Sequence, residues 1–327
     1  MTDFRRIAVL GGGAWGTALA NAAARAGREV ILWEFDRAQG EALIRERVNT
    51  RYLPGVPLED AVAPTVDIAA IAPADAALFV VPAQAMRGAA ALAAPHLKPG
   101  APAISCAKGI ERGSLAFMSQ IIHEALPDNP VGALSGPSFA AEVGRGLPAA
   151  VTIAVKEEWI AADLARALAS PSLRLYHSDD VTGVEIGGAA KNVIAIGAGI
   201  AAGRELGESA RAAFIARGFA ELRRFGAALG ARPETLMGLS GLGDLVLTAT
   251  SAQSRNFSHG FAIGRGEAPG GKLAEGIFTA RALVDLAGRH GVDMPICRAV
   301  RDVLERAISI GEAVEILLAR PLKAEVY

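Results

Sequence analysis

Short apolar runs alternate with helical stretches over the first half of the chain. The first two runs flank an Ala-rich helical segment, Thr17–Ala26, which Gly27 ends, so together they predict one βαβ unit. Alternation of this kind predicts a mainly parallel sheet that is covered by helices. The predicted strands are Ile7–Leu10, Glu29–Trp33, Ala76–Val81, Ala103–Ala107, Val131–Leu134, Ala150–Val155 and Arg174–Tyr176.

After about His177 the pattern becomes helical, with Gly, Pro and Asn breaks between the segments. The glycine-rich stretch over residues 264–272 is expected to be a loop. We therefore predict an α/β protein with a Rossmann-type domain over residues 1–178 and an all-helical, substrate-binding domain over residues 179–327. The predicted helices of the second half are Asp180–Gly203, Ser209–Gly230, Phe278–Gly291 and Pro295–Ala307.

Composition narrows the class of partner. The chain has 327 residues, 51% of them hydrophobic, and a formal net charge of −1, which argues against binding to nucleic acid or to an anionic membrane. Its two cysteines have no CxxC spacing, and its five histidines have no metal-ligand spacing, so we expect a cytoplasmic protein without a metal site. The first residues run straight into a strand, so no secretion signal is expected.

The apolar run Val181–Ala202 approaches the length that spans a bilayer. Glu185, Lys191 and Asn192 interrupt it, and charge inside a membrane is costly. We therefore expect a buried helix and no membrane insertion.

The glycines Gly11, Gly13 and Gly16 lie between a predicted strand and a predicted helix. This is the context of the dinucleotide fingerprint, in which the glycines allow a tight turn, close approach to the pyrophosphate and close helix–strand packing. A glycine-rich turn without a ligand is the simpler alternative. The βαβ context favours the dinucleotide.

The residues after the second strand bear on the choice of cofactor. Glu34 lies close to the distance at which a carboxylate accepts a hydrogen bond from the ribose 2′-hydroxyl and repels a 2′-phosphate. Phe35 and Asp36 follow, and Arg37 could reach a 2′-phosphate if the loop turned back. The sequence thus favours NAD over NADP.

Lys191 is the strongest catalytic candidate, because it lies in an apolar helix of a chain that has only six lysines. A lysine, unlike an arginine, can lose its proton near neutral pH when it is desolvated or close to another cation. General acid–base chemistry on an alcohol or carbonyl needs such a group. The alternative is a lysine that extends from the helix surface into solvent.

Several other polar residues are candidate ligands of a small molecule. Lys108 follows a predicted strand, where ligands collect in open α/β sheets, although it could be a solvated loop residue. Ser138 could contact a ligand, cap the following helix, or do both. Asp244 follows two glycines and could be a turn residue. Ser254, Arg255 and Asn256 would together supply several donors to a phosphate.

In this order, these motifs resemble the NAD(P)-dependent glycerol-3-phosphate dehydrogenases, and the resemblance covers nearly the whole chain. It implies a Rossmann domain and a helical substrate domain, an active site between them, and a homodimer. One departure is Phe35, where many bacterial members of that family carry a basic residue. The matching segments are Leu10–Leu19, Asn49–Gly55, Phe79–Pro82, Lys108–Gly109, Gly136–Ala140, Glu185–Asn192, Gly241–Asp244, Ser254–Asn256 and Glu275–Gly276.

The resemblance also implies roles for single residues. Lys191 would exchange the proton at the C2 oxygen of the substrate, and Asp244 would orient both. Lys108 would take part in catalysis and in binding. The glycerol phosphate would be held by Lys108, Gly136, Ser138, Lys191, Asp244, Ser254, Arg255 and Asn256. The cofactor would be bound by Gly11, Gly13, Ala14, Trp15, Gly16, Glu34, Phe35, Arg37, Lys108, Ala140, Arg255, Leu273 and Glu275.

The leading hypothesis is therefore reversible hydride transfer between NAD(P)H and dihydroxyacetone phosphate or sn-glycerol 3-phosphate, feeding glycerophospholipid synthesis. A second hypothesis is another Rossmann dehydrogenase with a helical second domain, acting on a hydroxy acid or a hydroxyacyl thioester. The Ser254–Asn256 cluster favours a phosphorylated substrate over a hydroxy acid or a hydroxyacyl thioester. A third is a non-catalytic dinucleotide sensor, which would leave Lys191 and Asp244 without a purpose.

Overall fold

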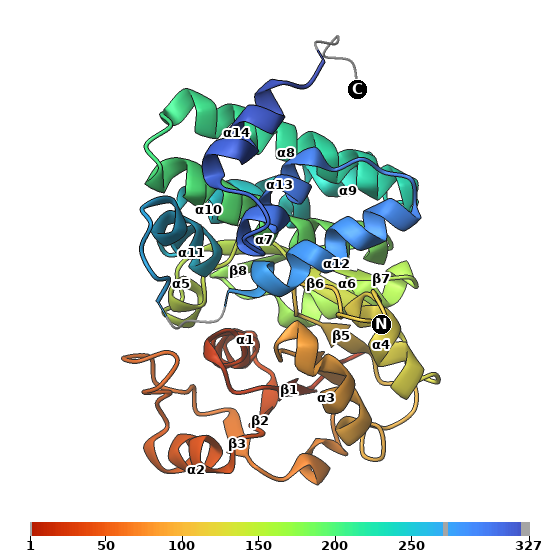
Figure 1. Ribbon diagram of the computed structural model, residues 1–327. Coiled ribbons are helices and arrows are strands. Elements are labelled where there is room, and N and C mark those ends of the chain that lie inside the picture. The colour runs from red at the N-terminus through yellow and green to blue at the C-terminus, as the bar shows by residue number, and fades with distance from the viewer. Residues whose placement is uncertain (1, 271–273, 322–327) are drawn as a thin grey trace. The chain divides into compact units, whose positions relative to one another are not determined.

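The computed structural model describes residues 2–270 and 274–321 (Figure 1). Its contacts divide the chain into two compact units, Met1–Ala107 with Ala116–Glu185, and Lys108–Leu115 with Ile186–Tyr327. The short segment Lys108–Leu115 thus groups with the helical second unit, which nothing in the sequence pattern indicates. The domain boundary after residue 178 stays a prediction.

The first unit is built on one eight-stranded sheet in the order β3-β2-β1-β4-β5-β6-β7-β8. All neighbouring strands are parallel except β6 and β7, which are antiparallel, so the predicted mainly parallel sheet is confirmed. The strands are β1 Arg6–Leu10, β2 Glu29–Trp33, β3 Val62–Thr65, β4 Ala76–Phe79, β5 Ala103–Ser105, β6 Val131–Ser135, β7 Ala149–Val155 and β8 Leu173–Ser178.

Helices cover both faces of this sheet, because successive side chains of a strand point to opposite faces. In β1, Ile7 and Val9 pack with helices α1 and α6, whereas Ala8 and Leu10 pack with α3 and α4. Figure 1 shows α1 and α3 on the two sides of β1. The helical elements of this unit are α1 Ala14–Arg25, α2 Arg37–Glu46, η1 Ile68–Ile71, η2 Ala83–Ala85, α3 Met86–Ala93, α4 Met118–Ala125, α5 Ala140–Gly144 and α6 Glu158–Leu168.

The second unit is helical, and residues 179–270 and 274–321 contain no strand. The all-helical prediction for this half is therefore confirmed. The first helix, α7, begins in the first unit and continues into the second. The elements are α7 Val181–Gly203, α8 Glu208–Ala228, α9 Pro233–Met237, the π-helical segment η3 Leu239–Gly243, α10 Asp244–Thr250, α11 Arg255–Gly264, α12 Glu275–Arg289, α13 Pro295–Leu304 and α14 Ile310–Leu318.

Helix α7 is the core helix of this part of the chain. By length and composition it alone, among the described helices, could cross a membrane, but 94% of its apolar window is buried inside the structure. The buried helix predicted from Val181–Ala202 is thus confirmed.

Glycines bring α7 and α11 into backbone contact. A Cβ atom on Gly260 of α11 would lie 1.9 Å from the carbonyl oxygen of Ile196, and one on Gly199 of α7 would lie 2.1 Å from that of Phe257. A side chain at either position would therefore force the helices apart. This contact fixes the first turn of α11 beside α7.

Some element boundaries differ from the predicted ones. Helix α1 begins at Ala14 rather than Thr17, and α12 begins at Glu275 rather than Phe278. Strand β3 was not predicted, because its four residues include a proline and are mostly not buried. Elements α9, η3, α10, α11 and α14 were also missed. The first three have only five, five and seven residues, which is too short to show a helical repeat.

Candidate active site

The glycine turn between β1 and α1 has the shape that the fingerprint requires. Gly11 has φ +116°, and a Cβ atom there would lie 2.6 Å from the carbonyl oxygen of Val80. A Cβ atom on Gly16 would lie 1.8 Å from the carbonyl oxygen of Gly11, whereas one on Gly13 would meet nothing within 4 Å. Two of the glycines are therefore required by packing, and Gly13 leaves the backbone open to a ligand.

The N-terminus of α1 suits an anionic group. Gly13 is its N-cap residue and offers no side-chain cap to the first-turn N–H groups, which begin with those of Ala14 and Trp15. The buried indole N–H of Trp15 has no hydrogen-bond partner among the described residues. Uncapped amides, an open backbone and an unsatisfied donor together fit the pyrophosphate of a dinucleotide.

Glu34 holds the glycine turn. One carboxylate oxygen accepts the N–H of Gly12 at 2.8 Å, and the other accepts the N–H of Asp36 at 2.9 Å. A carboxylate can accept about four hydrogen bonds, so capacity for a ribose hydroxyl remains. Phe35 is 74% exposed beside the edge of Trp33, and Arg37 pairs with Glu41 at 2.8 Å on α2.

Asn49 is a positioning residue of this turn that was given no role from the sequence. Its side chain is fully buried and donates to the carbonyl oxygen of Gly12 and to the hydroxyl of Thr17, both at 2.7 Å. Its amide oxygen accepts from Gln39 at 3.0 Å and from the N–H of Tyr52 at 3.0 Å. Asn49 is the first residue of the matching segment Asn49–Gly55. The resemblance therefore marked this residue, whereas its position relative to the glycines did not.

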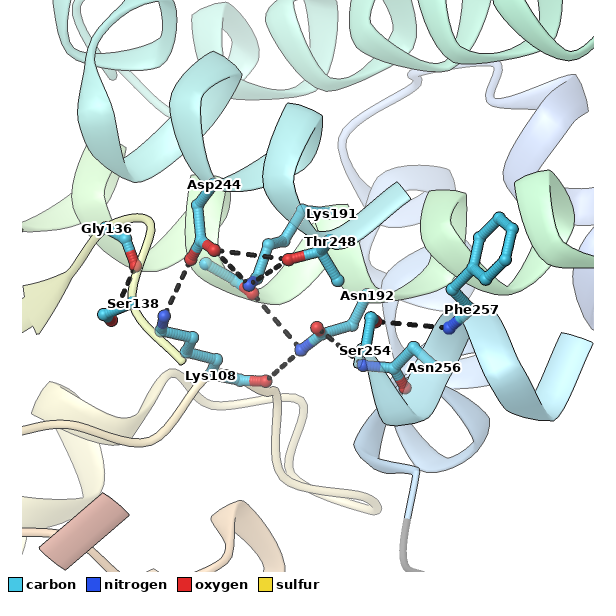
Figure 2. Close-up of polar contacts among 11 residues, drawn as sticks. Lys108, Gly136, Ser138, Lys191, Asn192, Asp244, Thr248, Ser254, Asn256 and Phe257 are labelled. Atoms are coloured by element: carbon cyan, nitrogen blue, oxygen red, sulfur yellow. Dashed lines mark hydrogen bonds and ion pairs between the residues drawn. The ribbon is translucent and has the colours of Figure 1, made fainter. Parts of the chain in front are cut away.

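In the second unit, two lysines converge on one aspartate (Figure 2). Lys191 of α7 donates to Oδ1 of Asp244 at 2.5 Å, and Lys108 donates to Oδ2 at 2.7 Å. Asp244 is the first residue of α10 and is 1% exposed, and Lys191 is 5% exposed. Lys108, Lys191 and Asp244 therefore lie together in the structure, and the surface-lysine alternative for Lys191 does not hold.

Burial changes the proton affinity of this cluster. It lowers the pKa of Lys191 from 10.5 to about 7; attraction to Asp244 opposes the shift, and the like charge of Lys108 adds to it. Burial would raise the pKa of Asp244, but the two ammonium groups outweigh it and hold that pKa below its ordinary value. At neutral pH the cluster therefore contains an ionised aspartate and a lysine able to gain or lose a proton.

Thr248 completes the surroundings of the Lys191 amine and was missed from the sequence. Its hydroxyl accepts from Lys191 Nζ at 2.8 Å and donates to Asp244 Oδ1 at 3.2 Å. Thr248 lies four residues after Asp244 on α10, which places both side chains on one face of the helix. Because α10 was not predicted, that spacing carried no signal.

A chain of side-chain amides connects the lysine cluster to α11 and α12. Asn192 donates to the carbonyl oxygen of Lys108 at 3.0 Å, and Asn256 donates to the amide oxygen of Asn192 at 2.8 Å. The amide oxygen of Asn256 accepts the N–H of Gly276 at 3.0 Å. These bonds fix the Lys108 backbone and the helix that carries Arg255.

The predicted phosphate ligands lie at the start of α11. Ser254 caps this helix by accepting the N–H of Phe257 at 3.2 Å, and Arg255 is exposed in its first turn. Glu275 begins α12 and favours the charged form of Lys191. Leu273, a predicted cofactor residue, lies outside the described residues.

Gly136, Ser138 and Ala140 belong to the first unit. Gly136 has φ +150°, and a Cβ atom there would lie 2.8 Å from the Cα atom of Val151. The hydroxyl of Ser138 donates to the carbonyl oxygen of Gly136 at 3.0 Å. Of the alternatives for Ser138, the one in which it caps the following helix does not hold, because α5 begins at Ala140 and Phe139 occupies the N-cap position.

Two family models match the chain over almost its full length. The model of the NAD-dependent glycerol-3-phosphate dehydrogenase N-terminus matches residues 6–161, and that of the C-terminus of the same family matches residues 180–315. The chain belongs to this family. Glycerol-3-phosphate dehydrogenases of the [NAD(P)+] type from Azorhizobium caulinodans and a Bradyrhizobium strain are 59% and 58% identical to it, each over 99% of the chain and 100% of the relative.

A solved structure agrees with this membership. The glycerol-3-phosphate dehydrogenase of Coxiella burnetii is 36% identical and superposes with a TM-score of 0.92, covering 97% of this chain and 99% of the other. Hydroxy-acid dehydrogenases and dinucleotide sensors are not favoured by these comparisons. The cofactor is NAD or NADP, because the name of these relatives covers both nucleotides.

Proposed function

We propose that this member of the glycerol-3-phosphate dehydrogenase family interconverts dihydroxyacetone phosphate and sn-glycerol 3-phosphate, with Lys191 exchanging the proton at the C2 oxygen. The observation that carries the proposal is the buried Lys191–Asp244 contact of 2.5 Å, together with a lysine pKa of about 7. A group with a pKa near the working pH both donates and accepts a proton efficiently.

The dinucleotide, when bound, supplies the hydride that C2 of the ketone gains in one direction and takes it back in the other. As the C2 carbon gains a hydride, its oxygen gains negative charge and needs a proton. Lys191 in its ammonium form gives that proton and becomes a neutral amine. Asp244 stays ionised and holds the amine of Lys191 through Oδ1. The hydroxyl of Thr248 makes a second hydrogen bond with this amine and so fixes its orientation.

Arg255 is the group that best suits the substrate phosphate. It is exposed in the first turn of α11, and an arginine binds a phosphate in bidentate geometry. Lys108, Gly136, Ser138, Ser254 and Asn256 are proposed to complete the phosphate and glycerol site. Asn256 already uses one amide hydrogen within the protein, so its second amide hydrogen remains as a donor to the substrate.

We further propose that the enzyme is cytoplasmic and that its product feeds glycerophospholipid synthesis. Neither Cys106 nor Cys297 forms a disulfide, and both are buried, which is consistent with a reducing compartment.

The decisive test is Lys191→Met, which keeps the length of the side chain and removes the proton carrier. We expect kcat to fall by about two to four orders of magnitude, because a methionine side chain has no proton to exchange with the C2 oxygen. Binding of NADH, measured by its fluorescence, should be retained. Lys156→Met, at an exposed lysine, is the control and should leave kcat unchanged. A Lys191→Met enzyme with near-normal turnover would rule the proposal out.

A further inference from the structure

An exposed arginine, Arg51, lies beside the loop that follows strand β2. It donates to Oδ2 of Asp36 at 3.1 Å, and the central carbon of its guanidinium lies 4.9 Å from the centre of the Tyr52 ring. Among the described residues, the bond to Asp36 is its one hydrogen bond. A guanidinium has five N–H donors, so most of those of Arg51 remain available to a ligand.

The position of Arg51 relates it to the ribose end of a dinucleotide. In a dinucleotide-binding βαβ unit, the carboxylate at the end of the second strand, here Glu34, faces the 2′ position of the adenosine ribose. Glu34 accepts the N–H of Asp36 at 2.9 Å, and Asp36 in turn accepts from Arg51. The guanidinium is therefore connected through Asp36 to the carboxylate that marks the 2′ position.

The turn that carries Arg51 is held by the same side chain as the glycine turn. Asn49, which is fully buried, donates to the carbonyl oxygen of Gly12 at 2.7 Å and accepts the N–H of Tyr52 at 3.0 Å. The carbonyl oxygen of Asn49 accepts the N–H of Leu53 at 2.8 Å. Arg51 is therefore presented from a turn that is fixed relative to the dinucleotide fingerprint.

Arg37, the basic residue expected near the 2′ position, is directed elsewhere. It begins α2, and its Nε donates to Glu41 one turn further along the same helix at 2.8 Å. Its side chain is 81% exposed. Of these two arginines, Arg51 is the one whose side chain bonds to the loop between β2 and α2.

We propose that Arg51 binds the 2′-phosphate of NADP, and that Asp36 competes with the phosphate for it. The side chains of Arg51 and Asp36 are 57% and 49% exposed, and an ion pair this exposed contributes little stability. A phosphate carries more charge than a carboxylate, and an arginine binds it in bidentate geometry, so it displaces Asp36. The inference rests on the dinucleotide binding that the proposed function assumes, but not on the reaction itself.

Asp36 opposes NADP through its charge. The N–H of Gln39 and the guanidinium of Arg51 hold the pKa of this carboxyl below its ordinary value, against the effect of partial desolvation. Its Oδ1 also accepts the N–H groups of Ala38 and Gln39, as the N-cap of α2. An asparagine makes the same cap, so Asp36→Asn removes the negative charge and keeps the helix start.

The first test measures binding of NADPH and NADH to the full chain by nucleotide fluorescence, without substrate. Arg51→Gln should weaken NADPH binding about tenfold relative to NADH binding, and Arg51→Lys should weaken it less because it keeps the charge. Asp36→Asn should strengthen NADPH binding about threefold or more relative to NADH binding.

Arg45→Gln is the matched control, because Arg45 is an exposed arginine of α2 that pairs with Glu46. It removes the same charge away from the end of β2, so the ratio of the two dissociation constants should stay within about twofold of the parent. Thermal unfolding of each variant checks that the fold is kept.

The second test asks whether the gain in Asp36→Asn is made through Arg51. The double variant Asp36→Asn/Arg51→Gln should lose that gain, because the phosphate then has no guanidinium to bind. Adenosine 2′,5′-bisphosphate and adenosine 5′-monophosphate differ only in the 2′-phosphate. Displacement of NADH by these two compounds should therefore show the same pattern across the variants.

Equal weakening of NADPH and NADH binding by Arg51→Gln would overturn the proposal, as would a larger loss of NADPH binding in Arg37→Gln. If the parent binds NADH but not NADPH, Asp36→Asn must bring NADPH binding with it, and its failure to do so overturns the proposal too. Intact nucleotide binding without turnover of dihydroxyacetone phosphate would refute the proposed function alone. A chain that binds neither nucleotide refutes both.

Discussion

The chemistry of Lys191 depends on where its amine lies. On an exposed helix face a lysine keeps a pKa near 10.4 and is almost always charged at neutral pH. Here burial lowers the pKa to about 7, and Asp244 retains enough attraction to hold the amine in place. An arginine at this position would keep its charge and could not exchange the proton.

The two directions of the reaction should therefore respond oppositely to pH. Ketone reduction needs the ammonium form, so its kcat should fall as pH rises through about 7. Alcohol oxidation needs the neutral amine, so its kcat should rise over the same range. Steady-state kinetics at saturating substrate in both directions measure this.

The variant Lys108→Met tests whether the pH dependence of kcat arises from the pKa of Lys191. Removing the like charge of Lys108 should raise the pKa of Lys191 and move both midpoints up by as much as about one pH unit. Parallel pH profiles in the two directions would show that Lys191 is not the proton carrier.

The cofactor preference rests on Glu34 and Phe35. The carboxylate of Glu34 lies at the end of β2 beside the glycine turn, where it disfavours a 2′-phosphate. We expect kcat/KM with NADH to be at least equal to kcat/KM with NADPH. Phe35→Arg should raise kcat/KM with NADPH about tenfold or more, because an arginine binds a phosphate strongly. Phe35→Met is the control, and a parent enzyme that strongly prefers NADPH would contradict this use of Glu34.

Among the helices, the contact between α7 and α11 positions the proposed phosphate ligands. Gly260→Ala would place a Cβ atom 1.9 Å from the carbonyl oxygen of Ile196, so α11 must move away and carry Arg255 with it. We expect KM for dihydroxyacetone phosphate to rise about tenfold or more and the melting temperature to fall by several degrees.

Gly288→Ala on α12 is the matched control for this substitution. A Cβ atom there meets nothing within 4 Å, and alanine favours a helix over glycine by about 1 kcal/mol. The control should therefore keep KM and melt no lower than the parent. An unchanged KM for Gly260→Ala would show that the helix contact does not position the phosphate site.

Strands β1 and β2 were predictable because each is a short apolar run and the two flank an Ala-rich helical segment. Helices α7, α8 and α13 were predictable as longer segments between Gly, Pro and Asn breaks. The antiparallel direction of β7 was not predictable, because a buried strand has the same apolar pattern whichever way it runs in the sheet. Helix α10 was not predicted, because it follows directly on the glycine-rich segment η3. Without that helix, the contact of Thr248 with Lys191 could not be predicted either.

For the molecule as a whole, the chain passes between the two units three times, after Ala107, Leu115 and Glu185. Only the last passage has a signal in the sequence, namely the change from strands to helices. The first two arise because Lys108–Leu115 contributes the buried side chains of Ile110 and Leu115 to the second unit. Local pattern cannot show which of two cores a short loop will join.

This organisation predicts how the first unit behaves when it is produced alone. Ile110 is 0% exposed and Leu115 8% exposed in the whole chain. A fragment of residues 1–185 lacks the unit that buries them, whereas both apolar clusters on the sheet come entirely from the first unit. The fragment should fold but bind a hydrophobic dye and aggregate.

Replacing residues 108–115 of that fragment with eight glycines and serines should remove the dye binding and keep the melting temperature within a few degrees. The reason is that the replaced segment stabilises the other unit, which the fragment lacks. In the fragment, each exposed Ile or Leu side chain of this segment loses the stabilisation of about 1.5–3 kcal/mol that its burial gives in the whole chain. Dye fluorescence and light scattering of the two fragments measure the difference. If the substituted fragment unfolds at a much lower temperature than the native-sequence fragment, the segment belongs to the core of the first unit instead.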